Sequence, residues 1–263
     1  MKFVEKLLQA SRKNNSLLCV GLDPDPELMP KVKLLDFLRE IIQATSDLVC
    51  AYKPNLAFYE ALGLEGLATL KKMLEFIPTE IPVIGDAKRG DIGNSSRKYA
   101  RALFDWFGFD AVTVNPYLGE DSLRPFLEYA DRGVFVLCLT SNPGASDFQA
   151  FGGELRLFEL VARKAKEWNA RGNVGLVVGA TQVEGLRRVR ELCPEMPLLI
   201  PGVGAQRGDL ESAVRYGGEK TVINSSRGIL YASRGGDFAS AARREAQRLR
   251  DEINRIRYGD KGR

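Results

Sequence analysis

Short apolar runs alternate with longer amphipathic segments along this chain, and this alternation limits the folds that it can form. Near-continuous apolar runs are typical of strands that are buried on both faces, and the segments between them have the spacing of helices that cover a sheet. The pattern predicts eight parallel strands over residues 17–23, 48–54, 81–88, 111–116, 134–141, 174–181, 198–204 and 221–227.

Eight strand–helix units in 263 residues match an α/β fold of the (β/α)8 TIM-barrel type. A doubly wound open sheet is the alternative. It is disfavoured because no G-x-G-x-x-G pattern follows the first predicted strand, and because no linker or change in composition divides the chain. We therefore expect one barrel domain over residues 1–263 that ends in an Arg-rich helix at about residues 238–259.

The C-terminal segment carries most of the net charge of +4. Six arginines stand against three acidic residues between Phe238 and Gly259, which gives +3. Such a segment could contact nucleic acid or a membrane, but its interspersed acids favour a solvated helix face. Ala242, Leu249 and Ile253 share a face with Phe238 and should pack against the barrel. We expect neither a nucleic-acid nor a membrane partner.

Composition restricts both the chemistry and the compartment. The chain contains no histidine, so proton transfer must use Lys, Asp, Glu, Tyr or Cys. Its four cysteines show no C-x-x-C spacing, which argues against a zinc site and favours buried free thiols in a reducing cytosol. No run approaches the roughly 20 apolar residues that cross a bilayer, and the N-terminus does not resemble a signal peptide. We expect a cytoplasmic protein.

The most informative motif is D-A-K-R-G-D-I-G at residues 86–93, which follows the apolar run of residues 81–85 at the carboxyl end of the third predicted strand. Asp86 and Lys88 are two residues apart, so they project to one face of an extended chain. Charged side chains at the end of a buried strand are costly to bury unless opposite charges compensate one another. Asp86 and Lys88, together with Asp91, therefore suggest a functional cluster. Polar residues also mark the ends of other predicted strands, as expected at the carboxyl rim of a barrel: Asp23, Lys53, Asn115, Ser141, Gln206 and Arg227.

Glycines mark the carboxyl ends of the last two predicted strands. Gly202 and Gly204 lie at the end of the seventh, and Gly228 follows Arg227 at the end of the eighth. Barrels often bind phosphate with these two loops, because glycines let backbone N–H groups approach an anion. Arg227 can then bind the phosphate in bidentate fashion. The sequence therefore predicts a phosphorylated substrate.

The D-x-K-x-x-D-I pattern of residues 86–92 resembles the signature of orotidine 5'-phosphate decarboxylases, and the similarity extends over essentially the whole predicted barrel. The stretches N-P-G at 142–144 and N-P-Y at 115–117 resemble the longer bacterial branch of that family. The resemblance implies conversion of orotidine 5'-monophosphate (OMP) to uridine 5'-monophosphate (UMP), the last step of de novo pyrimidine biosynthesis, without metal or cofactor.

The resemblance also implies roles for individual residues. Lys53, Asp86, Lys88 and Asp91 correspond to an alternating charge array in which Lys88 donates the proton. In the family, Asp91 and Ile92 reach into the site of the neighbouring subunit, so the catalytic unit would be a homodimer.

Further residues resemble the family's substrate contacts. Asp23 would hold the ribose, and Ser95 would contact it where some relatives place Thr. Ser141 would bind the pyrimidine. Gln206 and Arg227 would bind the phosphate.

Two other functions compete with this interpretation. Mg2+-dependent sugar-phosphate decarboxylases and aldolases share the D-x-K-x-x-D pattern, but they carry an acidic ligand after the second strand, where Lys53 would repel a cation. A nucleotide-binding regulatory protein would keep the phosphate loops and lose the charge array. Because Asp86, Lys88 and Asp91 are all present, we expect an enzyme.

Overall fold

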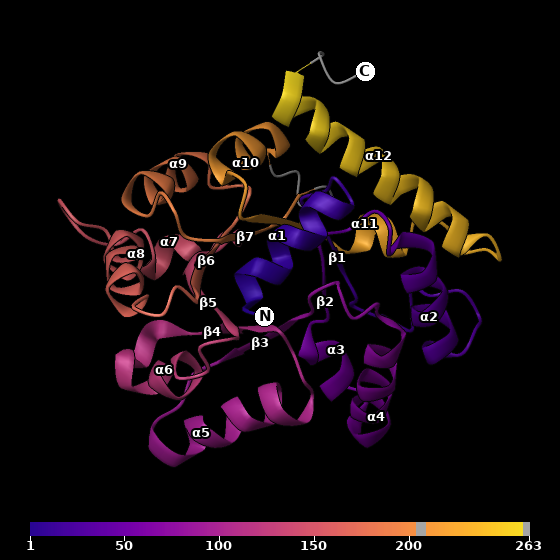
Figure 1. Cartoon of the computed structure of the whole chain (residues 1–263), viewed down its shortest axis with the longest axis horizontal. Helices are drawn as coiled ribbons and strands as arrows, with labels where there is room; N and C mark the ends of the chain where they lie inside the picture. Colours follow the sequence, from indigo (N-terminus) through magenta and orange to yellow (C-terminus); the bar gives the residue numbers. More distant parts are fainter. Residues whose placement is uncertain (204–208, 260–263) are drawn as a thin grey trace.

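The computed structural model describes residues 1–203 and 209–259. Within these residues, eight parallel strands form one sheet in the order β2-β1-β8-β7-β6-β5-β4-β3. Parallel bridges between Tyr52 and Val83 and between Asn55 and Asp86 join its two edge strands, so the sheet closes into a barrel surrounded by helices (Figure 1). The strands are β1 (Leu18–Gly21), β2 (Ala51–Lys53), β3 (Ile84–Arg89), β4 (Ala111–Val114), β5 (Gly133–Leu139), β6 (Val174–Val178), β7 (Leu198–Pro201) and β8 (Thr221–Ser225).

The predicted barrel is confirmed, and each expected strand range contains or overlaps an observed strand. All eight observed strands are shorter than expected: β2 and β3 begin three residues later, and the other six end two or three residues earlier, before the polar residues at their carboxyl ends. The described α-helices are α1 (Phe3–Lys13), α2 (Leu34–Thr45), α3 (Leu56–Glu60), α4 (Gly63–Met73), α5 (Gly93–Arg101), α6 (Glu120–Leu127), α7 (Ala145–Phe148), α8 (Leu157–Trp168), α9 (Val183–Leu192), α10 (Leu210–Gly217), α11 (Arg227–Leu230) and α12 (Phe238–Tyr258). Shorter turns are the 3-10 helices η1 (Leu74–Phe76) and η3 (Pro116–Leu118) and the π-helix η2 (Ala102–Trp106).

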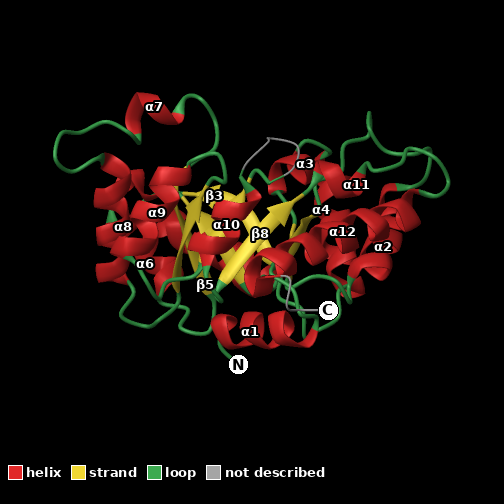
Figure 2. Ribbon diagram, turned by 90° about the horizontal axis from the view of Figure 1, so that it is seen from above, coloured by secondary structure: helices red, strands yellow, loops and turns green. Residues whose placement is uncertain are grey.

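The interior of the barrel is filled by a small apolar cluster to which every described strand contributes. The helix α1 lies across the amino end of the barrel, opposite α3, α7 and α11 (Figure 2). Its Phe3 meets Phe135 edge to face, with the ring centroids 5.7 Å apart, and Leu7 belongs to the same cluster. The amino end is therefore packed shut, and the carboxyl ends of the strands form the open rim.

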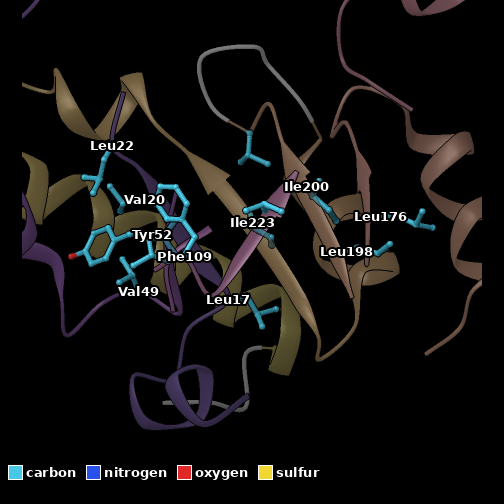
Figure 3. Close-up of a cluster of buried hydrophobic side chains, with 14 of the residues drawn as sticks. Leu17, Val20, Leu22, Val49, Tyr52, Phe109, Leu176, Leu198, Ile200 and Ile223 are labelled. Carbon is cyan, nitrogen blue, oxygen red and sulfur yellow. The ribbon is translucent and has the colours of Figure 1, made fainter. Parts of the chain in front are cut away.

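A larger apolar core lies between the barrel and its helices. Figure 3 shows part of this core, in which Val20, Tyr52, Phe109 and Ile223 are fully buried. Burying a side chain of this size contributes about 1.5–3 kcal/mol. Most of the stabilisation of the fold thus comes from this outer layer.

The Arg-rich C-terminal segment forms the helix α12, close to its expected bounds. The expected apolar face is buried, including Phe238 and Leu249. The guanidinium of Arg243 binds both carboxylate oxygens of Asp47 at 2.6 and 2.8 Å. The helix thus packs on the barrel through one face and pairs its charges on the other, as expected of a solvated helix.

All four cysteines are free and buried, as the spacing predicted. Burial raises the pKa of the Cys50 thiol to about 12, which keeps it protonated. Among the described helices, none has the combination of length and apolar character that crossing a membrane requires.

Candidate active site

Charged side chains come together where β1, β2 and β3 end at the open rim. Lys53 Nζ lies 2.9 Å from Asp86 Oδ2, and Lys88 Nζ lies 2.7 Å from Asp86 Oδ1. Asp23, which follows β1, is close enough for its charge to raise the pKa of Lys53. Parallel strands bring their carboxyl ends to one edge, so four of the predicted residues share one site.

The members of this cluster differ in burial. The side chains of Lys53 and Asp86 are 5% and 11% exposed, whereas that of Lys88 is 47% exposed. Burial alone would raise the pKa of Asp86, but the ammonium groups of Lys53 and Lys88 outweigh it and hold that pKa well below its ordinary value. Burial alone would likewise lower the pKa of Lys53, but Asp86 and Asp23 raise it above its ordinary value. Asp86 and Lys53 therefore stay charged at neutral pH.

The strand β3 is irregular where it carries the cluster. Its pairing with β4 shifts register between Gly85 and Arg89, and Lys88 has φ of +49°. This left-handed conformation is unfavourable for a residue with a side chain and costs on the order of 1–3 kcal/mol. The bulge places the Lys88 ammonium against the carboxylate of Asp86, two residues before it.

Thr113 of β4 completes the cluster, and the sequence did not single it out. Its hydroxyl accepts a hydrogen bond from the Lys88 backbone N–H at 2.9 Å and donates one to Asp86 Oδ1 at 2.8 Å. A hydroxyl within an otherwise apolar strand was the available signal, but Thr is common in strands for its shape alone.

Asp23 is fixed by backbone contacts. Its Oδ1 accepts a hydrogen bond from the Asn55 N–H at 3.1 Å. The hydroxyl of Tyr231 donates to the Asp23 carbonyl at 2.8 Å and accepts from the Asp25 N–H at 2.6 Å. The first-strand loop is thereby tied to the loop that follows α11.

Ser141 follows β5 on the opposite side of the rim. A Cβ on Gly179 would lie 2.7 Å from the Ser141 backbone nitrogen and 2.8 Å from its Cα. Only glycine can therefore occupy position 179 while the Ser141 backbone keeps this place. Asn115, which the sequence placed at the rim, directly follows β4 there, and its side chain accepts the Tyr117 N–H at 3.1 Å and caps η3.

The structure describes some of the residues after β7 and β8 that were predicted to bind phosphate. Arg227 is exposed at the start of α11, and its guanidinium has no hydrogen bond or ion pair with the described residues. Gly202 has φ of +94°, a conformation that glycine adopts readily. Gly228 is exposed beside Arg227. Gly204 and Gln206 lie outside the described residues.

Residues 16–244 match the sequence model of the orotidine 5'-phosphate decarboxylase / HUMPS family. The chain belongs to this family. It is 56% identical to the orotidine 5'-phosphate decarboxylase of Dehalococcoides mccartyi (strain BAV1), over 98% of this chain and 99% of that protein.

The chain is also similar to solved structures of this family. The OMP decarboxylase of Leishmania donovani is 41% identical, with a TM-score of 0.86, and the match covers 98% of this chain and all of that one. The UMP synthase of the same organism is 42% identical, with a TM-score of 0.89, and this chain spans 57% of its length.

The second acidic residue of the family motif stands apart from the first in this chain. Asp91 lies in the loop between β3 and α5, and its Oδ1 accepts the N–H of Ile92 at 2.7 Å. Ile92 is 59% exposed, and Ser95 is exposed in the first turn of α5. The structure therefore brings Asp23, Lys53, Asp86 and Lys88 together, and it leaves Asp91, Ile92 and Ser95 at the surface of a single chain.

Side chains of metal-ligating types do not gather into one group within the described residues. Across residues 1–203 and 209–259, no group of three or more His, Cys, Asp or Glu side chains could hold a metal ion. At the rim itself, Asp86 is already engaged by two ammonium groups.

Proposed function

We propose that this chain catalyses the decarboxylation of OMP to UMP, the last step of de novo UMP biosynthesis, as one barrel domain that needs no metal or cofactor. The observation that carries the proposal is the ion-paired Lys53–Asp86–Lys88 cluster, which lies at the rim of a barrel whose relatives are orotidine 5'-phosphate decarboxylases. Arg227 on the β8 side of the rim, whose guanidinium has no partner among the described residues, suits a phosphate monoester.

Lys88 is the residue suited to the reacting carbon. Loss of CO2 from C6 of the pyrimidine leaves a carbanion-like centre, which a fixed ammonium can stabilise and then protonate. The half-exposed side chain of Lys88 can reach a ligand at the rim. The proton passes from Nζ to C6, and solvent then restores the ammonium.

Asp86 has two roles in this proposal. It holds the ammonium of Lys88 in place through the 2.7 Å contact, and its negative charge lies beside the departing carboxylate. Lys53 keeps Asp86 ionised, because its ammonium lies 2.9 Å from the other carboxylate oxygen. The electrostatic field of the site is thus established before the substrate binds.

The remaining predicted residues are proposed to bind the parts of OMP that do not react. Arg227 and Gln206 bind the phosphate with Gly202, Gly204 and Gly228. Binding energy from a remote phosphate can be used to orient the reacting carbon. On the other side of the nucleotide, the ribose hydroxyls face Asp23 and Ser95, and Ser141 donates to the base edge.

A homodimer is part of the proposal. Ile92 exposes an apolar side chain beside Asp91, and a second copy of the chain would cover it while placing Asp91 near the partner's Lys88. A cytoplasmic location is proposed as well, and it is supported by four cysteines that stay free.

The test is an absorbance assay of OMP consumption by the wild type and by the Lys88→Ala variant, with a chelator present throughout. We expect the wild type to stay active, and Lys88→Ala to lose at least about 10^3-fold in kcat while still binding UMP. Lys72→Ala removes an exposed lysine on α4 and is the matched control. Near-normal turnover by Lys88→Ala would contradict the assignment. Chelated wild type that recovers only with Mg2+ would point to sugar-phosphate chemistry instead.

A further inference from the structure

We propose that Thr113 is a positioning residue for the proton donor, acting through hydrogen bonds to Lys88 and Asp86 rather than on the substrate. The inference rests on the proposed function and extends it to a residue on a strand that no predicted catalytic group occupies. Thr113 lies in the middle of β4 and is 1% exposed.

The first argument concerns the backbone of Lys88. The bulge in β3 removes its N–H from regular pairing with β4, and this N–H instead donates to Thr113 Oγ1 at 2.9 Å. A buried N–H without a partner is costly, so the hydroxyl replaces the lost ladder bond. Without it, the left-handed conformation of Lys88 at φ +49° would lose a contact that maintains it.

The second argument concerns the direction of the hydrogen bonds. A backbone N–H can only donate, so Thr113 Oγ1 accepts from Lys88 and keeps its own proton for another partner. That proton is directed to Asp86 Oδ1 at 2.8 Å, the same oxygen that accepts the Lys88 ammonium at 2.7 Å. One hydroxyl therefore connects the backbone of Lys88 to the carboxylate that orients its ammonium.

The orientation of Asp86 depends on the same contact. Its Oδ2 is held by Lys53 and its Oδ1 by Thr113, which fixes the plane of the carboxylate from two neighbouring strands. Because Lys88 is half exposed, it has room to adopt other rotamers unless this carboxylate stays in place. A displacement of about 1 Å in a reacting group can cost on the order of 10²-fold in rate.

The experiment compares Thr113→Val, which keeps the shape and removes the hydroxyl, with Thr113→Ser, which keeps the hydroxyl. We expect Thr113→Val to lower kcat by about 10- to 100-fold with KM for OMP and the Kd for UMP changed less than about threefold. Thr113→Ser should stay within about threefold of the wild type in kcat. Thr221→Val is the matched control, since Thr221 is a buried strand threonine whose Oγ1 has no hydrogen-bond partner among the described residues.

A Thr113→Val enzyme with wild-type kcat would overturn the inference, and so would equal losses in Thr113→Val and Thr113→Ser. If Thr113→Val does not fold, Thr113→Ala and Thr113→Ser provide a second pair that differs by the hydroxyl alone, and equal kcat values in that pair would overturn it. A wild-type protein that does not decarboxylate OMP would overturn the proposed function together with this inference. An active wild type with an equally active Thr113→Val variant would overturn the inference alone.

Discussion

The two sides of the barrel rim are built differently. On the β1–β3 side, Lys53 and Asp86 are nearly buried and already paired within the chain. On the β7–β8 side, Arg227 is exposed, and its guanidinium makes no ion pair with the described residues. One side thus holds its charges in a fixed network, and the other presents a charge to solvent.

This difference corresponds to two physical tasks. A charge that must act on a transition state is most effective when it needs no reorganisation, and internal partners supply that rigidity. A charge that must bind a ligand loses affinity if a partner within the chain competes for it. We expect substitutions on the first side to change both stability and turnover, and those on the second side to change binding alone.

The largest effect is expected from Lys53→Met. The substitution removes one of the two ammonium groups that compensate buried Asp86, and breaking a buried ion pair costs about 3–5 kcal/mol. Urea unfolding should show a loss of that size. Lys72→Met, at an exposed position on α4, should stay within about 0.5 kcal/mol of the wild type. If both variants are equally stable, the fixed network contributes nothing to folding.

Arg227→Ala should separate binding from stability. A hydrogen bond to a charged group contributes about 1.5–3 kcal/mol, so KM for OMP should rise by about 10- to 100-fold. The free energy of unfolding should change by less than about 0.5 kcal/mol, because the guanidinium is exposed. Steady-state kinetics and urea unfolding measure the two quantities. Arg163→Ala on α8 removes another exposed arginine as a control, and an unchanged KM in Arg227→Ala would refute the phosphate role.

The smallest effect is expected from Gly179→Ala, which acts through the backbone on the side of the rim where Ser141 is proposed to bind the base. The added Cβ would lie 2.7 Å from the Ser141 nitrogen, and overpacking of this kind typically costs about 1–3 kcal/mol. We expect KM for OMP to rise by about three- to tenfold as Ser141 is displaced. Gly236→Ala, where a Cβ would meet nothing within 4 Å, is the control. Identical KM values in the two variants would remove Ser141 from base recognition.

The sequence was sufficient for the barrel and for the centre of the charge cluster. Eight apolar runs predicted eight strands, and the position of Asp86 and Lys88 at the end of one run predicted that both lie at the rim. Such features are local, because burial follows from the order of residues within one strand. The extended backbone expected at Lys88 is not found, since its φ is +49° and the bulge in β3 sets the direction of its side chain. Charged residues on apolar strands are also rare enough to stand out.

The missed features depend on contacts between distant segments. Thr113 resembles any strand threonine until the bulge in β3 presents the Lys88 N–H to it. Tyr231 bridges Asp23 and Asp25 from more than 200 residues away. Asn115 follows β4 at the rim as expected, but the capping contact of its side chain with the Tyr117 N–H was not predicted. In each case the partner, rather than the residue type, decides the role.

The helix α1 determines from which end of the barrel small molecules can reach the charge cluster. Phe3 and Leu7 close the amino end of the barrel, and apolar side chains from the strands fill its interior. OMP must therefore reach the charge cluster from the carboxyl rim, and CO2 and UMP must leave by the same side. Because UMP and OMP would occupy the same place at the rim, we expect UMP to inhibit competitively with respect to OMP.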